Sequence, residues 1–125
     1  MKLDPRFRAP TRAWFEGTFE RATLAQTQAF GPILSGESTL LFAPTGSGKT
    51  LAAFLAAIDG LLFDPVPDAR ARCRILYVSP LKSLAVDVER NLRAPLVGIT
   101  EAALRAGHPF HTPRIAVCSG DTPAK

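Results

Sequence analysis

A glycine-rich segment in the first half of the chain holds the residue types that bind the phosphates of a nucleotide. It reads Ala43-Pro44-Thr45-Gly46-Ser47-Gly48-Lys49-Thr50 and fits the phosphate-loop pattern, except that alanine replaces the first glycine. Small residues let successive backbone N–H groups curl around phosphate oxygens, and Lys49 supplies a charge to the β- and γ-phosphates. The Thr50 hydroxyl is suited to ligate Mg²⁺. We expect these residues to contact the nucleotide, Lys49 and Thr50 also serving catalysis: Pro44, Thr45, Gly46, Ser47, Gly48, Lys49 and Thr50.

The elements around this loop are expected to place it between a buried strand and a helix. Three short apolar runs, at residues 39–43, 75–79 and 115–119, lack polar alternation, which is typical of parallel strands covered on both faces. Helical patterns follow the first two runs, at residues 50–62 and 84–103, and Pro95 divides the second pattern into two stripes. Thr23 is expected to cap a further helix from Leu24 to about Leu34. The pattern predicts an α/β fold with a parallel sheet built from βαβ units.

A sheet of three strands is small, and the sequence reads as the front part of a larger domain. No helical pattern follows residues 115–119 to cover the last strand. We therefore expect an incomplete domain over residues 23–125, preceded by an N-terminal segment over residues 1–22. Cys118, within the last apolar run, is expected to be a buried small apolar residue.

The composition excludes several classes of protein. The 125 residues carry a net charge of +4 and are 46% hydrophobic, which argues against intrinsic disorder. The longest strongly apolar stretch, residues 51–58, is too short to span a bilayer, and no apolar signal region follows the N-terminus. The two cysteines form no CxxC pattern, so a zinc site is unsupported. We expect a cytoplasmic protein without membrane contact.

Three other segments help to decide among the kinases, GTPases, transporters and helicases that share a phosphate loop. The first runs from Phe19 to Gln26, which precedes Lys49 by 23 positions. The second, residues 79–85 (Ser-Pro-Leu-Lys-Ser-Leu-Ala), and the third, residues 118–124 (Cys-Ser-Gly-Asp-Thr-Pro-Ala), follow apolar runs. Taken singly, each has a simpler interpretation, namely a solvated helix face, a turn with Ser83 as helix cap, and a turn.

Taken together, these segments resemble the Lhr (large helicase-related) family of superfamily 2 helicases, over about residues 12 to 125. The first resembles the Q motif, which implies that Gln26 reads adenine through its amide and Phe19 packs on the base, with Thr23 in the same site. The second resembles motif Ia, and the third a segment that also touches the strand backbone. Where a helix begins, its N–H groups and nearby Lys and Ser side chains suit a phosphodiester. The resemblance implies nucleic-acid contacts from Pro80, Lys82, Ser83, Gly120, Asp121 and Thr122.

The resemblance implies ATP-dependent translocation 3′ to 5′ on single-stranded DNA or RNA, with unwinding of DNA or RNA–DNA hybrids in DNA repair. ATP and Mg²⁺ are the implied cofactors, and further helicase domains would follow Lys125. The family's D-E-x-H box, whose Asp holds Mg²⁺ and whose Glu activates water, does not occur in the 125 residues. We therefore expect negligible ATP hydrolysis by this chain alone. A nucleotide-binding fragment without turnover and another phosphate-loop ATPase are the alternatives.

Two aromatic residues near the N-terminus, Trp14 and Phe15, have two interpretations. Their rings could stack on a base of a nucleotide or nucleic acid, helped by the neighbouring Arg12. Alternatively, they dock an N-terminal helix onto the core, which is the more common role for such a pair. The docking interpretation is favoured.

Overall fold

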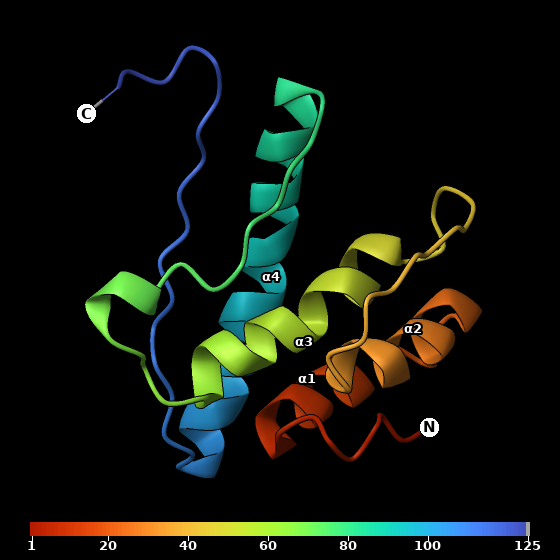
Figure 1. The fold of residues 1–125 in the computed structure, drawn as a ribbon. Coiled ribbons are helices and arrows are strands. Elements are labelled where there is room, and N and C mark those ends of the chain that lie inside the picture. Colours follow the sequence, from red (N-terminus) through yellow and green to blue (C-terminus); the bar gives the residue numbers. More distant parts are fainter. Residues whose placement is uncertain (125) are drawn as a thin grey trace.

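The computed structural model describes residues 1–124, and this part of the chain is helical (Figure 1). Its elements are α1 (Ala9–Thr18), α2 (Leu24–Leu34), α3 (Lys49–Phe63), the 3₁₀ turn η1 (Ala69–Ala71) and α4 (Lys82–Ala106). Helix α1 packs against α4, α2 packs against α3, and α3 also contacts α4. No helix within residues 1–124 is both long enough and apolar enough to cross a membrane.

Local chemistry explains where several of these helices begin and end. At the start of α2, Thr23 Oγ1 accepts the N–H of Gln26 (3.2 Å), and Gln26 Oε1 accepts the N–H of Thr23 (3.0 Å). This reciprocal pair is a capping box, and it confirms the predicted start of the helix at Leu24. Helix α4 ends at Gly107, whose φ of 64° is the left-handed conformation that favours glycine.

Helix α4 runs without interruption through Pro95, where the sequence pattern predicts a break. A proline in a helix interior removes the hydrogen bond to the carbonyl four residues earlier and costs about 3 kcal/mol. Pro95 itself is buried, and beyond it α4 places Ile99 and Ala103 in the core with no measurable exposure. Burying a residue such as Ile contributes about 1.5–3 kcal/mol, so packing of the later turns offsets the local cost.

The core lies where α1, α2, α3 and α4 meet. The aromatic side chains at its centre pack edge to face, with ring centroids 5.2 Å apart for Phe7 and Phe30 and 6.1 Å apart for Phe15 and Phe30. The buried apolar cluster comprises Leu3, Phe7, Phe15, Phe30, Leu55, Ile58, Leu62 and Ile99. Because three of these residues lie on α3, the core holds the helix that begins at the phosphate loop.

The predicted parallel sheet is wrong for the described part of the chain, because residues 1–124 contain no strand. The apolar runs at 39–43, 75–79 and 115–119 are irregular connections, drawn as thin ribbons without arrows in Figure 1. Within residues 1–124, no backbone hydrogen bond joins one run to another. Phe42 is 86% exposed and Leu76 is 82% exposed, and Cys118 is exposed instead of buried.

The reason lies in how a strand satisfies its backbone. A helix pairs its own N–H and C=O groups, whereas a strand needs a neighbour about 4.8 Å away. An apolar composition indicates that a segment is suited to the half-buried surface of a sheet. It does not indicate that a second strand lies beside the segment to accept and donate its hydrogen bonds. In this structure the helices pack on one another and leave the three runs outside the core. The fold of residues 1–124 is helical, and the α/β prediction with βαβ units is corrected accordingly.

Candidate functional site

The glycine-rich loop over residues 43–50 adopts the backbone shape that a phosphate cradle requires. Gly46 and Gly48 have φ values of 81° and 76°, a region that residues with a Cβ rarely adopt. The Ser47 N–H donates to the Pro44 carbonyl at 3.3 Å, which closes the turn. Helix α3 begins at Lys49, directly after this turn, with no side-chain cap on its first N–H groups. These uncapped donors and the positive end of the helix dipole suit an anion.

Two side chains in the loop have no strong hydrogen-bond acceptor in the free chain. Within residues 1–124, the Ser47 hydroxyl is buried and has no hydrogen-bond partner. The amino group of Lys49 donates to the carbonyl of Ala43, at the other end of the loop. A neutral carbonyl is a weaker acceptor for an ammonium group than a phosphate. A bound phosphate would therefore compete with the Ala43 carbonyl for Lys49.

Side chains at the start of α2 form hydrogen bonds with the backbone of the phosphate loop. Thr23 Oγ1 donates to the Ser47 carbonyl at 2.6 Å, and Gln26 Nε2 donates to the Gly48 carbonyl at 3.3 Å. A Cβ at Gly48 would lie 2.4 Å from Gln26 Nε2, and the φ of 76° at this position is one that residues with a Cβ rarely adopt, so glycine is favoured here. The structure thus brings together Thr23, Gln26 and the phosphate loop, as the sequence predicts. The Gln26 amide is engaged by the protein at both ends, and its adenine contact stays a prediction.

Phe19 lies in an aromatic cluster with two residues of α1. Its ring centroid is 4.8 Å from that of Phe15 and 5.8 Å from that of Trp14. Phe15 is fully buried, and Phe19 and Trp14 pack against the core from its edge. The docking interpretation of Trp14 and Phe15 is therefore confirmed, and contact of Phe19 with a base stays a prediction.

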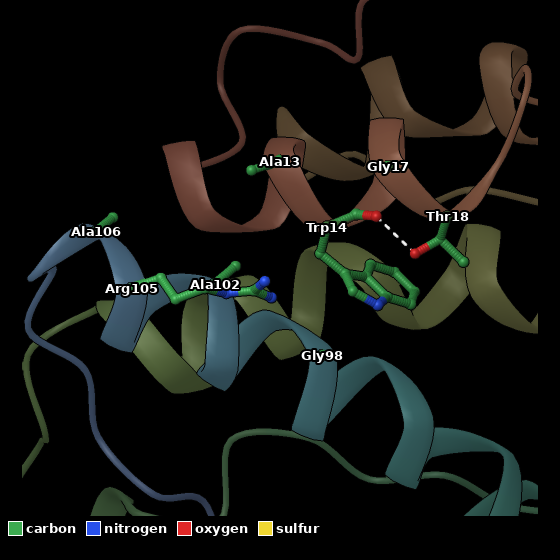
Figure 2. Close-up of a pocket in the computed structure, with 8 residues that line it drawn as sticks. All are labelled: Ala13, Trp14, Gly17, Thr18, Gly98, Ala102, Arg105 and Ala106. Carbon is green, nitrogen blue, oxygen red and sulfur yellow. Dashed lines mark hydrogen bonds between the residues drawn. The ribbon is translucent and has the colours of Figure 1, made fainter.

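Trp14 docks α1 onto α4 at a position where α4 has no side chain. A Cβ placed at Gly98 would lie 2.1 Å from the indole Nε1, and Figure 2 shows the indole laid against α4 at this glycine. Beside it is an open cavity of about 580 Å³. Its lining consists of Ala13, Trp14, Gly17, Thr18, Gly98, Ala102, Arg105 and Ala106. None of the residues predicted to bind nucleotide or nucleic acid lines this cavity.

The second predicted site lies at the start of α4. Leu81, and not Ser83, is the N-cap residue, and it provides no side-chain cap. Pro80, Lys82 and Ser83 are exposed. The amino group of Lys82 forms an ion pair with the carboxylate of Asp121, 39 residues later. The structure therefore joins two segments that the sequence assigns to nucleic-acid contact.

A buried carboxylate that the sequence interpretation did not single out fixes α1 to α3. Asp59 is 1% exposed and accepts hydrogen bonds from the Arg8 N–H (3.1 Å), the Thr11 hydroxyl (2.6 Å) and Arg8 Nη1 (2.7 Å). Asp59, on α3, thus fixes the residue that precedes α1 and the Thr11 side chain in its first turn. A single acidic residue within the apolar stretch that follows Thr50 in α3 is the signal that could have revealed it.

Arg8 forms ion pairs with Asp59 and Asp64, and these pairs change the protonation equilibrium of its guanidinium group. Partial burial lowers the pKa of the Arg8 guanidinium. The hydrogen bond to Asp59 and the charges of Asp59 and Asp64 act in the opposite direction and outweigh burial, so the pKa of Arg8 lies above its usual value. Arg8 stays charged throughout the accessible pH range, and it holds the N-terminal segment to α3.

Comparisons with known proteins extend over almost the whole chain. Residues 23–114 match the family model for DEAD/DEAH box helicases. The chain is 57% identical over 118 residues to "Lhr helicase/ probable uracil glycosylase" of Mycolicibacterium smegmatis, covering 94% of this chain and 8% of that protein. It is 45% identical to "ATP-dependent helicase Lhr-Core protein 2" of Thermococcus barophilus, covering 90% of this chain and 13% of that protein.

The chain is also similar to a solved structure of an Lhr helicase. The structure of Mycobacterium smegmatis helicase Lhr bound to ssDNA and AMP-PNP superposes with a TM-score of 0.84 at 56% sequence identity. The match covers 95% of this chain and 15% of that chain. This chain therefore spans only a small part of the length of each of these three relatives.

Proposed function

Because this chain belongs to the DEAD/DEAH box helicase family, within its Lhr group, we propose that it is the ATP-binding part of an ATP-dependent helicase. The observation that carries the proposal is the geometry of the phosphate loop. Two left-handed glycines lead into the uncapped start of α3, with the side chains of Thr23 and Gln26 bonded to the loop's own carbonyls.

The residues present fit a nucleoside triphosphate. Within residues 1–124, the Ser47 hydroxyl has no hydrogen-bond partner and the first N–H groups of α3 have no side-chain cap, so donors are unused at the loop, and Lys49 provides the charge. The solved relative holds AMP-PNP, an analogue of ATP, which supports an adenine nucleotide as the ligand. In this role Lys49 leaves the Ala43 carbonyl and stabilises the negative charge of the β- and γ-phosphates.

Mg²⁺ is a further part of the proposal. Among the described residues, no group of three or more His, Cys, Asp or Glu side chains could hold a metal ion. Mg²⁺ keeps several waters and binds through substrate phosphates and one or two carboxylates, so the exposed Thr50 hydroxyl is the ligand that we propose this segment contributes. When bound, the ion would neutralise charge on the phosphates.

Nucleic acid is the proposed second ligand. We assign the backbone contacts to the start of α4, on the strength of the exposed Lys82 and Ser83, with the turn at residues 119–122 held beside it by the Lys82–Asp121 ion pair. The relative was solved with ssDNA, which supports a single strand as the partner. Translocation from 3′ to 5′, unwinding of DNA or RNA–DNA hybrids, and a role in DNA repair belong to the same proposal.

The test of the nucleotide site uses the native-length protein and AMP-PNP with Mg²⁺. Lys49→Ala should weaken AMP-PNP binding at least about tenfold, because a charge-assisted hydrogen bond contributes about 1.5–3 kcal/mol and 1.4 kcal/mol is tenfold. Lys2→Ala removes the same charge from an exposed position outside the loop and should leave binding unchanged. Equal affinities for the two variants would overturn the proposal.

The same protein tests the helicase activity. We expect ATP hydrolysis that single-stranded DNA stimulates, and we expect the Lys49→Ala variant to lack it. The 125-residue chain alone should hydrolyse ATP no faster than its Lys49→Ala variant, since it contains no D-E-x-H box. Steady turnover by the short chain above that control would contradict this part of the proposal.

A further inference from the structure

The turn at residues 119–122 and the first residue of α4 meet through one ion pair. We propose that Asp121 is a built-in counter-ion for Lys82, and that a backbone phosphate of a single strand binds by displacing the Asp121 carboxylate. The inference rests on the proposed role of Lys82 in strand contact. It assigns Asp121 a positioning role in place of a direct contact with nucleic acid.

The ion pair is accessible to a ligand from solvent. The Lys82 side chain is 62% exposed and the Asp121 side chain is 79% exposed. An ion pair this exposed contributes little to stability, so breaking it costs little. A phosphate can therefore replace the carboxylate without rearrangement of the helical core.

The turn itself offers few free donors to a phosphate. The Ser119 N–H donates to Thr122 Oγ1 (2.8 Å), the Asp121 N–H donates to Ser119 Oγ (3.3 Å), and the Thr122 N–H donates to the Ser119 carbonyl (2.9 Å). Three backbone N–H groups of the turn are thus used within it. What the turn presents to Lys82 is the carboxylate of Asp121, which has the same charge sign as a phosphate.

The charge of Asp121 opposes the binding of a strand phosphate to Lys82. A phosphate at hydrogen-bond distance from Lys82 would lie close to Asp121 if the carboxylate stayed in place, and like charges at that separation repel each other. The carboxylate must move into solvent, where it regains its hydration and counterions. Asp121 therefore lowers strand affinity and reduces the number of counterions that binding releases.

The experiment measures binding of a fluorescently labelled oligo-dT strand to the native-length protein, by anisotropy at several KCl concentrations. Asp121→Asn should tighten binding about two- to fivefold near physiological salt, as expected for removal of an exposed ion pair. It should also steepen the slope of log K against log salt by up to about 0.7, the contribution of one phosphate on a single strand. Asp121→Glu, which keeps the charge, should stay close to the unmodified protein.

A matched control separates the effect of the Lys82–Asp121 ion pair on strand binding from the effect of net charge. Glu101→Gln removes one exposed negative charge from the same helix, 19 residues from Lys82. At 1.5 Å per residue this is about 28 Å along α4, well beyond the screening length of about 8 Å. This variant should leave both the affinity and the salt slope unchanged. In the Lys82→Ala background, Asp121→Asn should have no effect.

Five outcomes would overturn the inference. Weaker binding by Asp121→Asn would mean that the carboxylate contacts the strand, and an unchanged affinity would mean that it does not oppose binding. Equal tightening by Glu101→Gln, or tightening that persists in the Lys82→Ala background, would mean a general charge effect. If Lys82→Ala leaves strand affinity unchanged, the proposed role of Lys82 fails, and this inference fails with it.

Discussion

Replacing Gly98 with alanine should destabilise the contact between α1 and α4, although alanine is the better helix former. The added methyl carbon would lie 2.1 Å from Nε1 and 2.3 Å from Cδ1 of Trp14, far inside van der Waals contact. The indole is part of the packing against the core and cannot simply swing into solvent without exposing Phe15 and Phe19. Either α1 or the indole must shift.

The expected magnitude follows from two opposing effects. Glycine to alanine in a helix interior stabilises by about 0.8–1 kcal/mol, because the unfolded chain loses freedom and the helix gains propensity. Overpacking a well-filled contact costs about 1–3 kcal/mol. We therefore expect a net loss of about 1 kcal/mol in the free energy of unfolding, with a lower midpoint in urea.

The assay is urea unfolding of the 125-residue chain, followed by far-UV circular dichroism. Trp14 is the single tryptophan of the chain, so its emission reports directly on this contact. Gly17→Ala is the matched control, because Gly17 lines the same cavity and has open space where a Cβ would lie. It should be neutral or stabilising. Trp14→Phe should weaken the penalty of Gly98→Ala, since the smaller ring leaves room for the methyl group.

The reasoning fails if Gly98→Ala is as stable as Gly17→Ala and leaves Trp14 emission unchanged. That result would mean that the indole does not lie against Gly98. Destabilisation that is equally large in the Trp14→Phe background would mean that some other neighbour of Gly98 is responsible.

Three further predictions follow from the buried and supporting contacts. Asp59→Asn should lower the free energy of unfolding by about 1.5 kcal/mol in a urea titration, because the partly exposed Arg8 loses its charged partner on α3 but keeps Asp64. Gln26→Ala should weaken AMP-PNP binding several-fold in the native-length protein, whereas the exposed Gln28→Ala on the same helix should not. The hydrogen bond from the Arg6 side chain lowers the pKa of Asp4 below 3.8, so Asp4 stabilises the fold at neutral pH and this contribution disappears as the pH falls through the lowered pKa. Asp4→Asn should therefore flatten the acid side of the stability profile below about pH 4.

The helices show how far sequence reasoning reaches. The start of α2 was predictable because its capping box lies within four consecutive positions of the chain. Helix α3 was predictable from apolar side chains at helical spacing, and its observed bounds extend the prediction by one residue at each end. The interruption at Pro95 was wrong, because the propensity of one residue takes no account of the packing of Ile99 and Ala103 beyond it.

The sequence by itself determined the phosphate loop, its place before a helix and the membership of the helicase family, because these depend on residue types at fixed spacing. Only the tertiary structure decided that the apolar runs lie unpaired, since strand pairing is a property of two segments. It also decided which distant residues meet, among them Asp59 with Arg8, Lys82 with Asp121 and Trp14 with Gly98. Such contacts join positions 39 to 84 residues apart, and they depend on how the helices pack, which no local pattern encodes.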